Sequence, residues 1–415
     1  MAPVGRIEAN PEEEPRELQQ FDYELSEKDQ EDRLEEILQY LRDREARHDI
    51  VETTTTPMGQ KLHWIERDSQ VELGKVADPP SDGEALVAQQ EGEQEALPLT
   101  FELEQQGAET GPPGTVPMVA RPIDKIHPQG TLQDFLAKWN RPAPQPRPGT
   151  PELLEPPRAG SPHEYAYTSH SGTCYGAQAN INTWDPYVAY SDEFSLGQVA
   201  MAASSSKGLQ TVEAGHQEYR DIYGDWVPHL FIFYTTNGYS KSGNNLGGYN
   251  RDVDGWKQYS SSIYPGALSS PLSSFGGAQY QMSVKYQLWQ GNWWLQINGN
   301  WIGYYPAGLF SNPGLQASAA RADWYGEIVD SASHSFTTST DMGSGNFPSA
   351  GWQWAAYMNN IMYQSDTSGT MHDYTPASAW ASRPGCYNVE SHFASGTSWG
   401  SYFWWGGPGR NTQCP

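Results

Sequence analysis

The sequence predicts an all-β antiparallel two-sheet sandwich over residues 163–415, preceded by a small α+β unit. Two observations favour this division: a change of composition near residue 160, and a series of short aromatic and β-branched runs after it. Residues 1–160 contain 33 Asp and Glu and 16 Lys and Arg, whereas residues 161–415 contain 17 and 9. Fourteen of the 16 Trp and all three Cys lie in the second part. A chain of 415 residues is long enough for two or three domains, and these are two different kinds of polypeptide.

The first part carries few elements that could pack together. Residues 26–48 are expected to form an amphipathic helix, because the apolar residues recur at i, i+3, i+4 and i+7 from Leu34. Residues 60–67 alternate in the manner of a strand, and residues 131–139 fit a short helix with a capping box at its start. The acidic, Gln-rich stretch 82–109 is too polar to bury much apolar surface, which is typical of a solvated loop.

A proline-rich segment separates the two parts. Residues 141–162 read RPAPQPRPGTPELLEPPRAGSP and contain almost nothing that could join a core. Such a composition favours a semi-rigid, exposed spacer. We therefore expect an N-terminal domain over 1–140, a linker over 141–162 and a second domain over 163–415.

The second part consists of strand-like runs punctuated by Gly, Asn and Pro, and no long helical stripe interrupts them. Turn signals at roughly 8 to 12 residue spacing are typical of an antiparallel sandwich or barrel. The runs expected to be strands include Leu209–Gln217, His229–Thr235, Ala278–Trp289, Asn292–Ile297, Asn300–Tyr304, Trp324–Asp330 and Gly351–Tyr357.

Net charge narrows the range of partners. The chain has a formal net charge of −25 and a pI near 4.7. Because affinity for phosphate backbones or anionic lipid depends on clustered Lys and Arg, we expect no nucleic-acid and no membrane partner. The first residues lack the apolar core of a secretory signal, so we expect no signal peptide within this chain.

Common catalytic and metal motifs are weak here. Gly396-Thr-Ser398-Trp-Gly400 matches a nucleophile elbow, but no Asp, Glu or His follows Ser398 to complete a triad. Asn250, Asp252 and Asp254 resemble the start of a calcium loop, yet Ser261 stands where a bidentate Glu is needed. The histidines and cysteines show no metal-ligand spacing. We expect no metal and no cofactor.

Two glutamates stand out in a domain with little charge. Glu213 and Glu327 each lie inside an aromatic strand beside glycine, where β propensity disfavours them. Each is therefore either a solvated outward side chain or a functional group on a sheet face. Residues alone leave these two alternatives about equally favoured.

Several segments together resemble the neprosin family of glutamic endopeptidases. The most specific are Val212-Glu-Ala-Gly215 and Gly406-Gly-Pro-Gly-Arg-Asn411, and the similarity runs across nearly all of 163–415. Thr115-Val-Pro-Met118 resembles the end of that family's N-terminal activation domain. The resemblance implies a two-sheet β-sandwich, a catalytic pair at Glu213 and Glu327, and cleavage after proline at acid pH once the propeptide is removed.

The resemblance also directs the choice of supporting residues. Amide hydrolysis by two carboxyl groups needs one ionised and one protonated, and we take Glu327 as the base and Glu213 as the acid. Proline-rich peptides and the chain's own propeptide would be its partners. Side chains that could donate to the oxyanion are Gln198, Gln217 and Tyr325. Side chains that could line a substrate groove, unless they belong to the core, are Trp184, Trp289 and Trp294.

Two further expectations complete the interpretation. Cys386 and Cys414 bracket a compact C-terminal segment and are expected to pair, leaving Cys174 free. A disulfide implies an oxidising compartment, so we expect a secreted protein. A carbohydrate-active sandwich, either a glycoside hydrolase with the same carboxylates or a lectin-like module, is the alternative function.

Overall fold

The structure is a computed structural model, and it describes residues 27–81, 96–126, 128, 130–138, 163–331, 337–374 and 379–415. The expected linker over 141–162 lies outside the described residues. So do the end of the helix expected over 131–139 and residues 82–95 of the acidic stretch 82–109. The expectation of a solvated loop is wrong for the described part of that stretch, where Leu99, Phe101 and Leu103 are buried.

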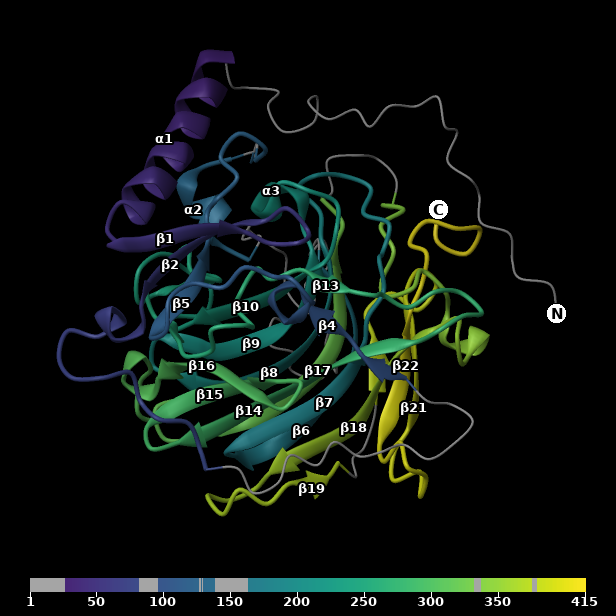
Figure 1. The fold of residues 1–415 in the computed structure, drawn as a ribbon. Coiled ribbons are helices and arrows are strands. Elements are labelled where there is room, and N and C mark those ends of the chain that lie inside the picture. Colours follow the sequence, from purple (N-terminus) through teal and green to yellow (C-terminus); the bar gives the residue numbers. More distant parts are fainter. Residues whose placement is uncertain are drawn as a thin grey trace.

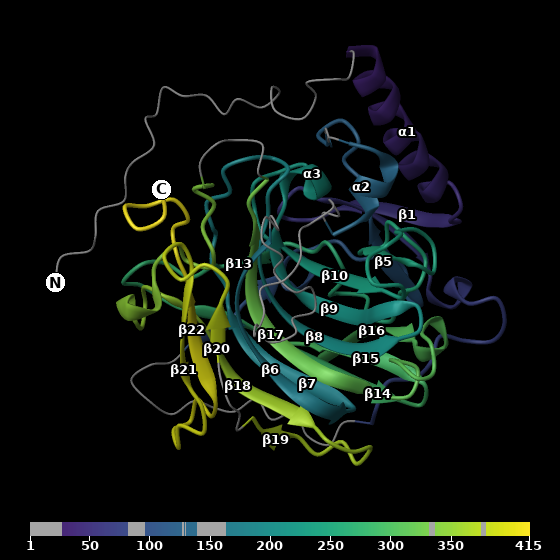
Figure 2. The same cartoon turned by 180° about the vertical axis from the view of Figure 1, so that it is seen from behind.

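A two-layer β-sandwich forms the larger part of the molecule (Figure 1), and Figure 2 shows its strands from behind. The first layer is a seven-stranded antiparallel sheet in the order β11-β10-β9-β8-β17-β6-β20. Its strands are β6 (His163–Cys174), β8 (Ser195–Ser205), β9 (Gly208–Glu218), β10 (His229–Thr235), β11 (Gly247–Tyr249), β17 (Ala319–Val329) and β20 (Ala379–Ala381).

The second layer is a ten-stranded sheet. Eight strands follow the order β12-β16-β15-β14-β7-β18-β22-β21, while β19 pairs with β18 and β3 pairs with β14. All of these pairings are antiparallel except β3 with β14. The strands are β3 (Leu97–Pro98), β7 (Gly176–Asn182), β12 (Lys257–Gln258), β14 (Tyr280–Trp289), β15 (Asn292–Ile297), β16 (Asn300–Pro306), β18 (Ala356–Gln364), β19 (His372–Asp373), β21 (Asn388–His392) and β22 (Tyr402–Gly406).

The core lies between the two sheets, because successive side chains of a strand point to opposite faces. On β17, Trp324 points inward and its indole nitrogen donates to the backbone oxygen of Gln178 on β7. Gly326 also faces inward: a Cβ there would lie 2.1 Å from the ring of Trp405. Glycine at 326 therefore lets the two sheets approach each other. The neighbouring odd-numbered residues of β17, Tyr325 and Glu327, point away from the other sheet.

The smaller part is an α+β unit at the N-terminus. The helix α1 (Glu27–Glu45) lies beside a three-stranded sheet of β1 (Ile50–Thr55), β2 (Lys61–Glu66) and β5 (Thr115–Val119), as Figure 1 shows. The short helix α2 (Leu132–Leu136) has the expected capping box at Thr131 and Asp134. This unit also has the 3-10 turns Arg67–Gln70 and Glu102–Glu104. The short helices of the sandwich part are α3 (Arg220–Tyr223) and the 3-10 turns Ala307–Leu309 and Pro348–Ala350.

Strand pairing joins the N-terminal unit to the sandwich. Besides β3, the strand β4 (Thr100–Phe101) pairs with β13 (Ser269–Ser270) of the sandwich. The apolar residues Ile37 and Leu41 of α1 belong to the same buried cluster as the sandwich core. A cavity of about 490 Å³ remains between the two parts, lined by residues such as Leu41, Lys61, Arg121 and Pro265. The contact is thus extensive but incompletely packed.

Most expected elements are present, with one clear correction. The expected runs at 209–217, 229–235, 292–297 and 300–304 match β9, β10, β15 and β16 closely. The run expected over Gly351–Tyr357 is wrong in its boundaries, since residues 352–354 form a turn and β18 begins at Ala356. Gln353 has a φ of 66°, which a strand does not accommodate.

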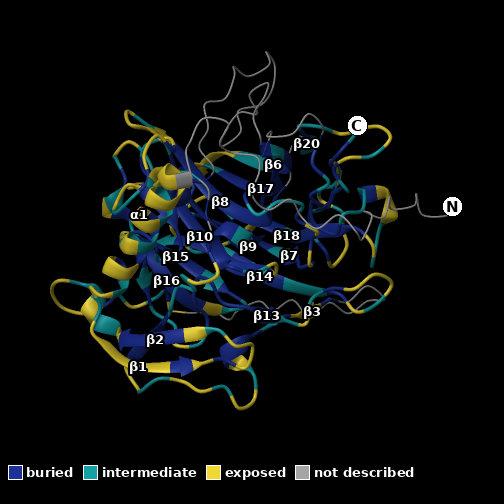
Figure 3. Cartoon of the chain, turned by 90° about the horizontal axis from the view of Figure 1, so that it is seen from above, coloured by how far each residue is buried: buried dark blue, intermediate teal, exposed yellow. Residues whose placement is uncertain are grey.

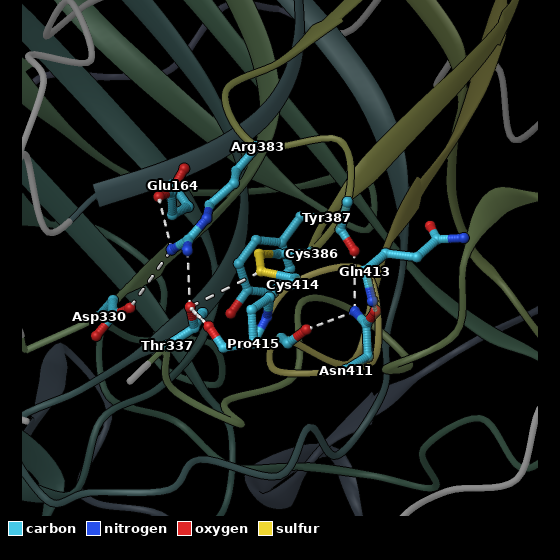
Figure 4. Close-up of a disulfide and its surroundings, with 12 residues drawn as sticks. Glu164, Asp330, Thr337, Arg383, Cys386, Tyr387, Asn411, Gln413, Cys414 and Pro415 are labelled. Atoms are coloured by element: carbon cyan, nitrogen blue, oxygen red, sulfur yellow. Dashed lines mark hydrogen bonds and ion pairs between the residues drawn. A yellow bond between two sulfur atoms is a disulfide. The ribbon is translucent and has the colours of Figure 1, made fainter. Parts of the chain in front are cut away.

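A disulfide closes the C-terminal segment. Cys386 and Cys414 are bonded, with Cα atoms 5.3 Å apart, and Cys174 is free and buried. Figure 4 shows Arg383 beside this bond, where its guanidinium lies 3.8 Å from Glu164 and 3.9 Å from Asp330 and donates to Thr337. These contacts tie the C-terminal segment to the ends of β6 and β17.

Burial is greatest in the central strands of the sandwich. Figure 3 shows the central strands mostly buried, while α1 and the peripheral loops carry most of the exposed surface. Within the described ranges, no helix has the length and apolar character needed to cross a membrane.

Candidate active site

The two glutamates lie on the face of the seven-stranded sheet that is turned away from the other sheet. Glu213 on β9 and Glu327 on β17 flank the central strand β8, where they pair with Ala200 and Leu196. Their exposed fractions are 0% and 1%. Both are therefore buried, which rules out the alternative of solvated outward side chains.

A lysine from the N-terminal unit joins the two carboxylates. Lys138 follows α2, and its Nζ lies 2.8 Å from Oε2 of Glu213 and 2.7 Å from Oε2 of Glu327. It also donates to Oε1 of Gln198 at 3.2 Å. Two carboxylate oxygens from distant strands thus reach one atom, the arrangement that a single shared water molecule would require.

Electrostatics keep this lysine charged. Burial lowers the pKa of Lys138, but the charges of Glu213 and Glu327 and their hydrogen bonds outweigh burial and raise it above its ordinary value. A buried ammonium is tolerated only when it is paired and hydrogen-bonded. The two carboxylates meet that requirement.

Neutral donors surround Glu213. Thr211 and Tyr239 each donate a hydroxyl hydrogen bond to its Oε1 at 2.7 Å, and Nε2 of Gln198 donates to its Oε2 at 2.9 Å. These three side chains come from β9 itself, from the segment after β10, and from β8. They fix the orientation of the carboxyl group without adding charge.

Glu327 has a different environment. Nδ1 of His163, the first residue of β6, lies 2.6 Å from its Oε1. Burial raises the pKa of Glu327, but the Lys138 charge and the His163 hydrogen bond outweigh burial and bring the pKa below its ordinary value. In this state Glu327 is held ionised by two basic side chains.

Two of the three expected oxyanion donors are in the site. Gln198 contacts Glu213 as described, and its amide also donates to the hydroxyl of Tyr325. Burial raises the pKa of Tyr325 well above its ordinary value, so the phenol keeps its proton. Gln217 is buried on the same face, but its amide donates to the hydroxyl of Tyr249 at 3.2 Å rather than to either glutamate.

The structure corrects the expected tryptophan groove. Trp289 and Trp294 belong to β14 and β15 of the other sheet, and Trp294 is fully buried in a cluster with Val76 of the N-terminal unit. Trp184 is also buried, after β7, against Phe275. Alternation within a strand indicates which residues share a face, but not which sheet carries the site.

Tyrosines occupy the positions near the glutamates instead. Tyr165 and Tyr167 of β6 pack with Tyr325 in a small buried cluster on the same face, and the rings of Tyr165 and Tyr325 are 5.8 Å apart. The Nζ of Lys138 lies 5.7 Å above the ring of Tyr325. Aromatic side chains thus line the site, although they are not the expected ones.

Sequence reasoning missed Lys138, His163, Thr211 and Tyr239. A weak signal existed for two of them: Lys138 is a lone cation at the end of an expected helix, and His163 is the first residue after the proline-rich segment. Neither signal gives a distance to a glutamate. Among the residues that the structure describes, no group of three or more His, Cys, Asp or Glu could hold a metal ion.

Fold and site together give a β-sandwich with a buried carboxylate pair. A family model described as Neprosin matches residues 191–408, which is more than half of the chain. The chain therefore belongs to the neprosin family, and it is a hydrolase of the glutamic peptidase type.

Solved structures show only distant similarity. Scytalido-glutamic peptidase with a transition state analog inhibitor is 9% identical, with 59% of this chain and 98% of that chain covered and a TM-score of 0.29. SCP-B, a member of the Eqolisin family, is 10% identical over 60% and 98%, with a TM-score of 0.28. The agglutinin CG-16 from chicken liver is 7% identical over 39% and 93%, with a TM-score of 0.22. These scores are too low to support an argument.

Proposed function

We propose that this chain is an acid-active glutamic endopeptidase that cleaves after proline, made as a secreted, latent precursor. The observation that carries the proposal is the position of Lys138, whose Nζ contacts both Glu213 and Glu327. An ammonium between two carboxylates stands where the attacking water would bind. The N-terminal unit therefore blocks the site with its own side chain.

The chemistry follows once Lys138 leaves. Glu327 takes a proton from water as the oxygen attacks the peptide carbonyl, and Glu213 gives its proton to the carbonyl oxygen. The tetrahedral intermediate collapses as Glu327 gives its acquired proton to the leaving nitrogen and Glu213 takes a hydroxyl proton back, which breaks the C–N bond and restores both glutamates. Gln198 and Tyr325 would donate to the oxyanion, an effect worth about 10²–10³ in turnover for a single donor.

Acid pH would serve this mechanism in two ways. Two carboxyl groups that share one site titrate apart, so that the pair holds a single proton over an acidic range. Protonation of one carboxyl group of the pair would also weaken the ion pairs with Lys138. Activity is therefore expected to be bell-shaped and centred at acid pH.

The finer parts of the proposal have separate support. Cleavage after proline is supported by the resemblance to the family and by Tyr165, Tyr167 and Tyr325, whose rings could stack on a prolyl ring. Secretion is supported by the disulfide between Cys386 and Cys414. Self-activation would use the proline-rich segment 141–162 as an intramolecular substrate at high effective concentration.

The test compares the full-length chain at pH 3 and pH 7. Purified protein is incubated with a proline-containing peptide and with a panel of polysaccharides, and the products are identified by mass spectrometry. We expect peptide cleavage after proline at pH 3, with trimming of the chain within 141–162 and no change in the polysaccharides. Polysaccharide cleavage alone would contradict the proposal and favour the glycoside hydrolase alternative.

Self-processing needs its own control. Glu213→Gln keeps the size of the side chain but cannot supply the second carboxyl group, so this variant should remain full-length at pH 3. If it is trimmed as fast as the wild type, a contaminating protease is responsible and self-activation is wrong.

A further inference from the structure

The two glutamates differ in the kind of side chain that supports them. Glu213 accepts hydrogen bonds from the neutral groups Thr211, Tyr239 and Gln198. Glu327 instead contacts two basic side chains, Lys138 and His163. Only one of these cations belongs to the N-terminal unit, so the asymmetry persists after that unit leaves.

His163 is fixed within the sandwich. It begins β6, pairs with Val329 of β17, and is 3% exposed. Its ring stacks on Tyr165 with centroids 6.1 Å apart and packs edge-on against Phe194 at 5.9 Å. The imidazole therefore stays beside Oε1 of Glu327 whatever happens to Lys138.

We propose that His163 is a positioning residue that keeps Glu327 ionised and so assigns it the role of general base, leaving Glu213 to carry the shared proton. This inference rests on the proposed peptidase function and deepens it. An imidazolium that donates from Nδ1 to a carboxylate stabilises the charged form, because charge-assisted hydrogen bonds are the stronger kind. Once Lys138 leaves, Glu327 keeps this contact with His163, whereas the donors that remain on Glu213 are neutral.

Other ionisable groups near the pair do not reverse this asymmetry. Burial raises the pKa values of Tyr249 and Tyr325 well above their ordinary value, so these two phenols stay neutral at acid pH. Glu164 also interacts with His163, and burial raises its pKa to about 7, with smaller opposing effects from Ser382 and Arg383. Glu164 is therefore mainly neutral at the acid pH at which the enzyme would work. Among the described residues, the groups that interact with Glu327 or His163 include Lys138, Glu213, Tyr249, Tyr325, Tyr165 and Glu164.

The sign of the effect gives a specific readout. Without a cation at 163, Glu327 would take up a proton at a higher pH, so the base would be lost earlier as the solution is acidified. The acid limb of the pH–rate profile should then move toward neutral pH. A residue with a merely structural role would lower the whole profile and leave its midpoints in place.

The experiment uses His163→Asn in the full chain after activation at acid pH. We expect the acid limb of kcat/KM for a proline-containing peptide to move up by about 1 to 3 pH units, with KM changed less than twofold. His170→Asn is the matched control, because His170 lies on the same strand but stacks on Tyr363, with ring centroids 3.8 Å apart. An unmoved acid limb in an active His163→Asn enzyme would overturn the inference.

A reciprocal measurement covers the case in which His163→Asn does not fold or the chain cleaves no peptide. Nitrogen-15 NMR of the histidine rings is recorded in the full chain with Glu327 intact and with Glu327→Gln. We expect the titration midpoint of His163 to fall by at least one pH unit in the variant, and that of His170 to stay unchanged. An unchanged His163 midpoint would overturn the inference, whereas a wild-type chain that cleaves no peptide would overturn only the proposed function.

Discussion

Charged residues serve different purposes in the N-terminal unit and in the sandwich. Along α1 most of the charged side chains are exposed, as Figure 3 shows for the helix as a whole. In the sandwich, Glu213 and Glu327 are buried and meet at one point. The only contact that the described N-terminal residues make with both glutamates is through Lys138, itself 5% exposed.

This difference shows that charge density and electrostatic importance are separate properties. Exposed ion pairs such as Arg42 with Glu35 are screened by water and contribute little to stability. Buried charges must be paired, and removing one partner leaves the other uncompensated. One lysine therefore matters more to the state of the site than the many carboxylates around it.

The largest expected effect tests the sandwich side of this comparison. Glu327→Gln preserves the size of the side chain but removes the base, and should lower kcat/KM for peptide cleavage at acid pH by roughly 10²–10⁴-fold. The matched control is Glu390→Gln on β21 of the other sheet, where Glu390 is exposed and pairs with His392 at 3.1 Å. Equal losses in both variants, measured after checking folding by circular dichroism, would contradict the assigned site.

The second effect tests the N-terminal side. Lys138→Met removes the ammonium and leaves two buried carboxylates facing each other, which should weaken docking of the N-terminal unit by about 3–5 kcal/mol. We expect peptide cleavage from the full-length variant at mildly acidic pH, where the glutamate pair holds its shared proton but the wild-type chain is still latent. Lys75→Met, at an exposed position of the same unit, serves as the control. A Lys138→Met chain that stays as latent as the control would contradict autoinhibition.

The third effect concerns pH. Because Lys138 lowers the pKa of Glu327, their pairing is at full strength above the usual range of a glutamate and is lost as pH falls through the lowered value. Each pKa unit of lowering corresponds to about 1.4 kcal/mol. In full-length Glu213→Gln chain, which cannot cleave itself, small-angle X-ray scattering should show expansion on acidification.

The comparison for that experiment is the double variant Glu213→Gln with Lys138→Met. It should be expanded already at neutral pH and change less on acidification. If the expansion depends on pH in the same way with and without Lys138, groups other than Lys138 drive release of the N-terminal unit.

The smallest effect is expected at the edge of the interface. Arg44 of α1 pairs with Asp254 at 3.0 Å, and the Asp254 side chain is 49% exposed. Because solvent screens this pair, Asp254→Asn should change the unfolding free energy by no more than about 1 kcal/mol. Chemical denaturation followed by fluorescence measures this change in unfolding free energy. A destabilisation as large as that caused by Lys138→Met would contradict the expectation that the exposed pair contributes less than the buried one.

Local patterns in the sequence predicted much of the sandwich. The runs that became β9, β10, β15 and β16 alternate strongly and end at turn residues, so local preference and tertiary packing agree. The strand expected at 351–357 failed because a turn containing Gln353 with positive φ precedes β18. The apolar and aromatic residues there did not distinguish a strand from a packed turn.

The candidate site was predicted only in part. Glu213, Glu327, Gln198 and Tyr325 share one face because a period of two residues fixes which side chains point together. Trp289 and Trp294 were misplaced, since the same period does not indicate which sheet a strand joins.

The sequence by itself determined the all-β class of the larger part, the alternation that pairs each glutamate with a sheet face, and the family to which the chain belongs. Only the tertiary structure decided that Lys138 and His163 reach the glutamates, from positions 75 residues before Glu213 and 164 residues before Glu327. The physical reason is that local preferences act over a few residues, whereas the partners of a buried charge are set by how distant segments pack.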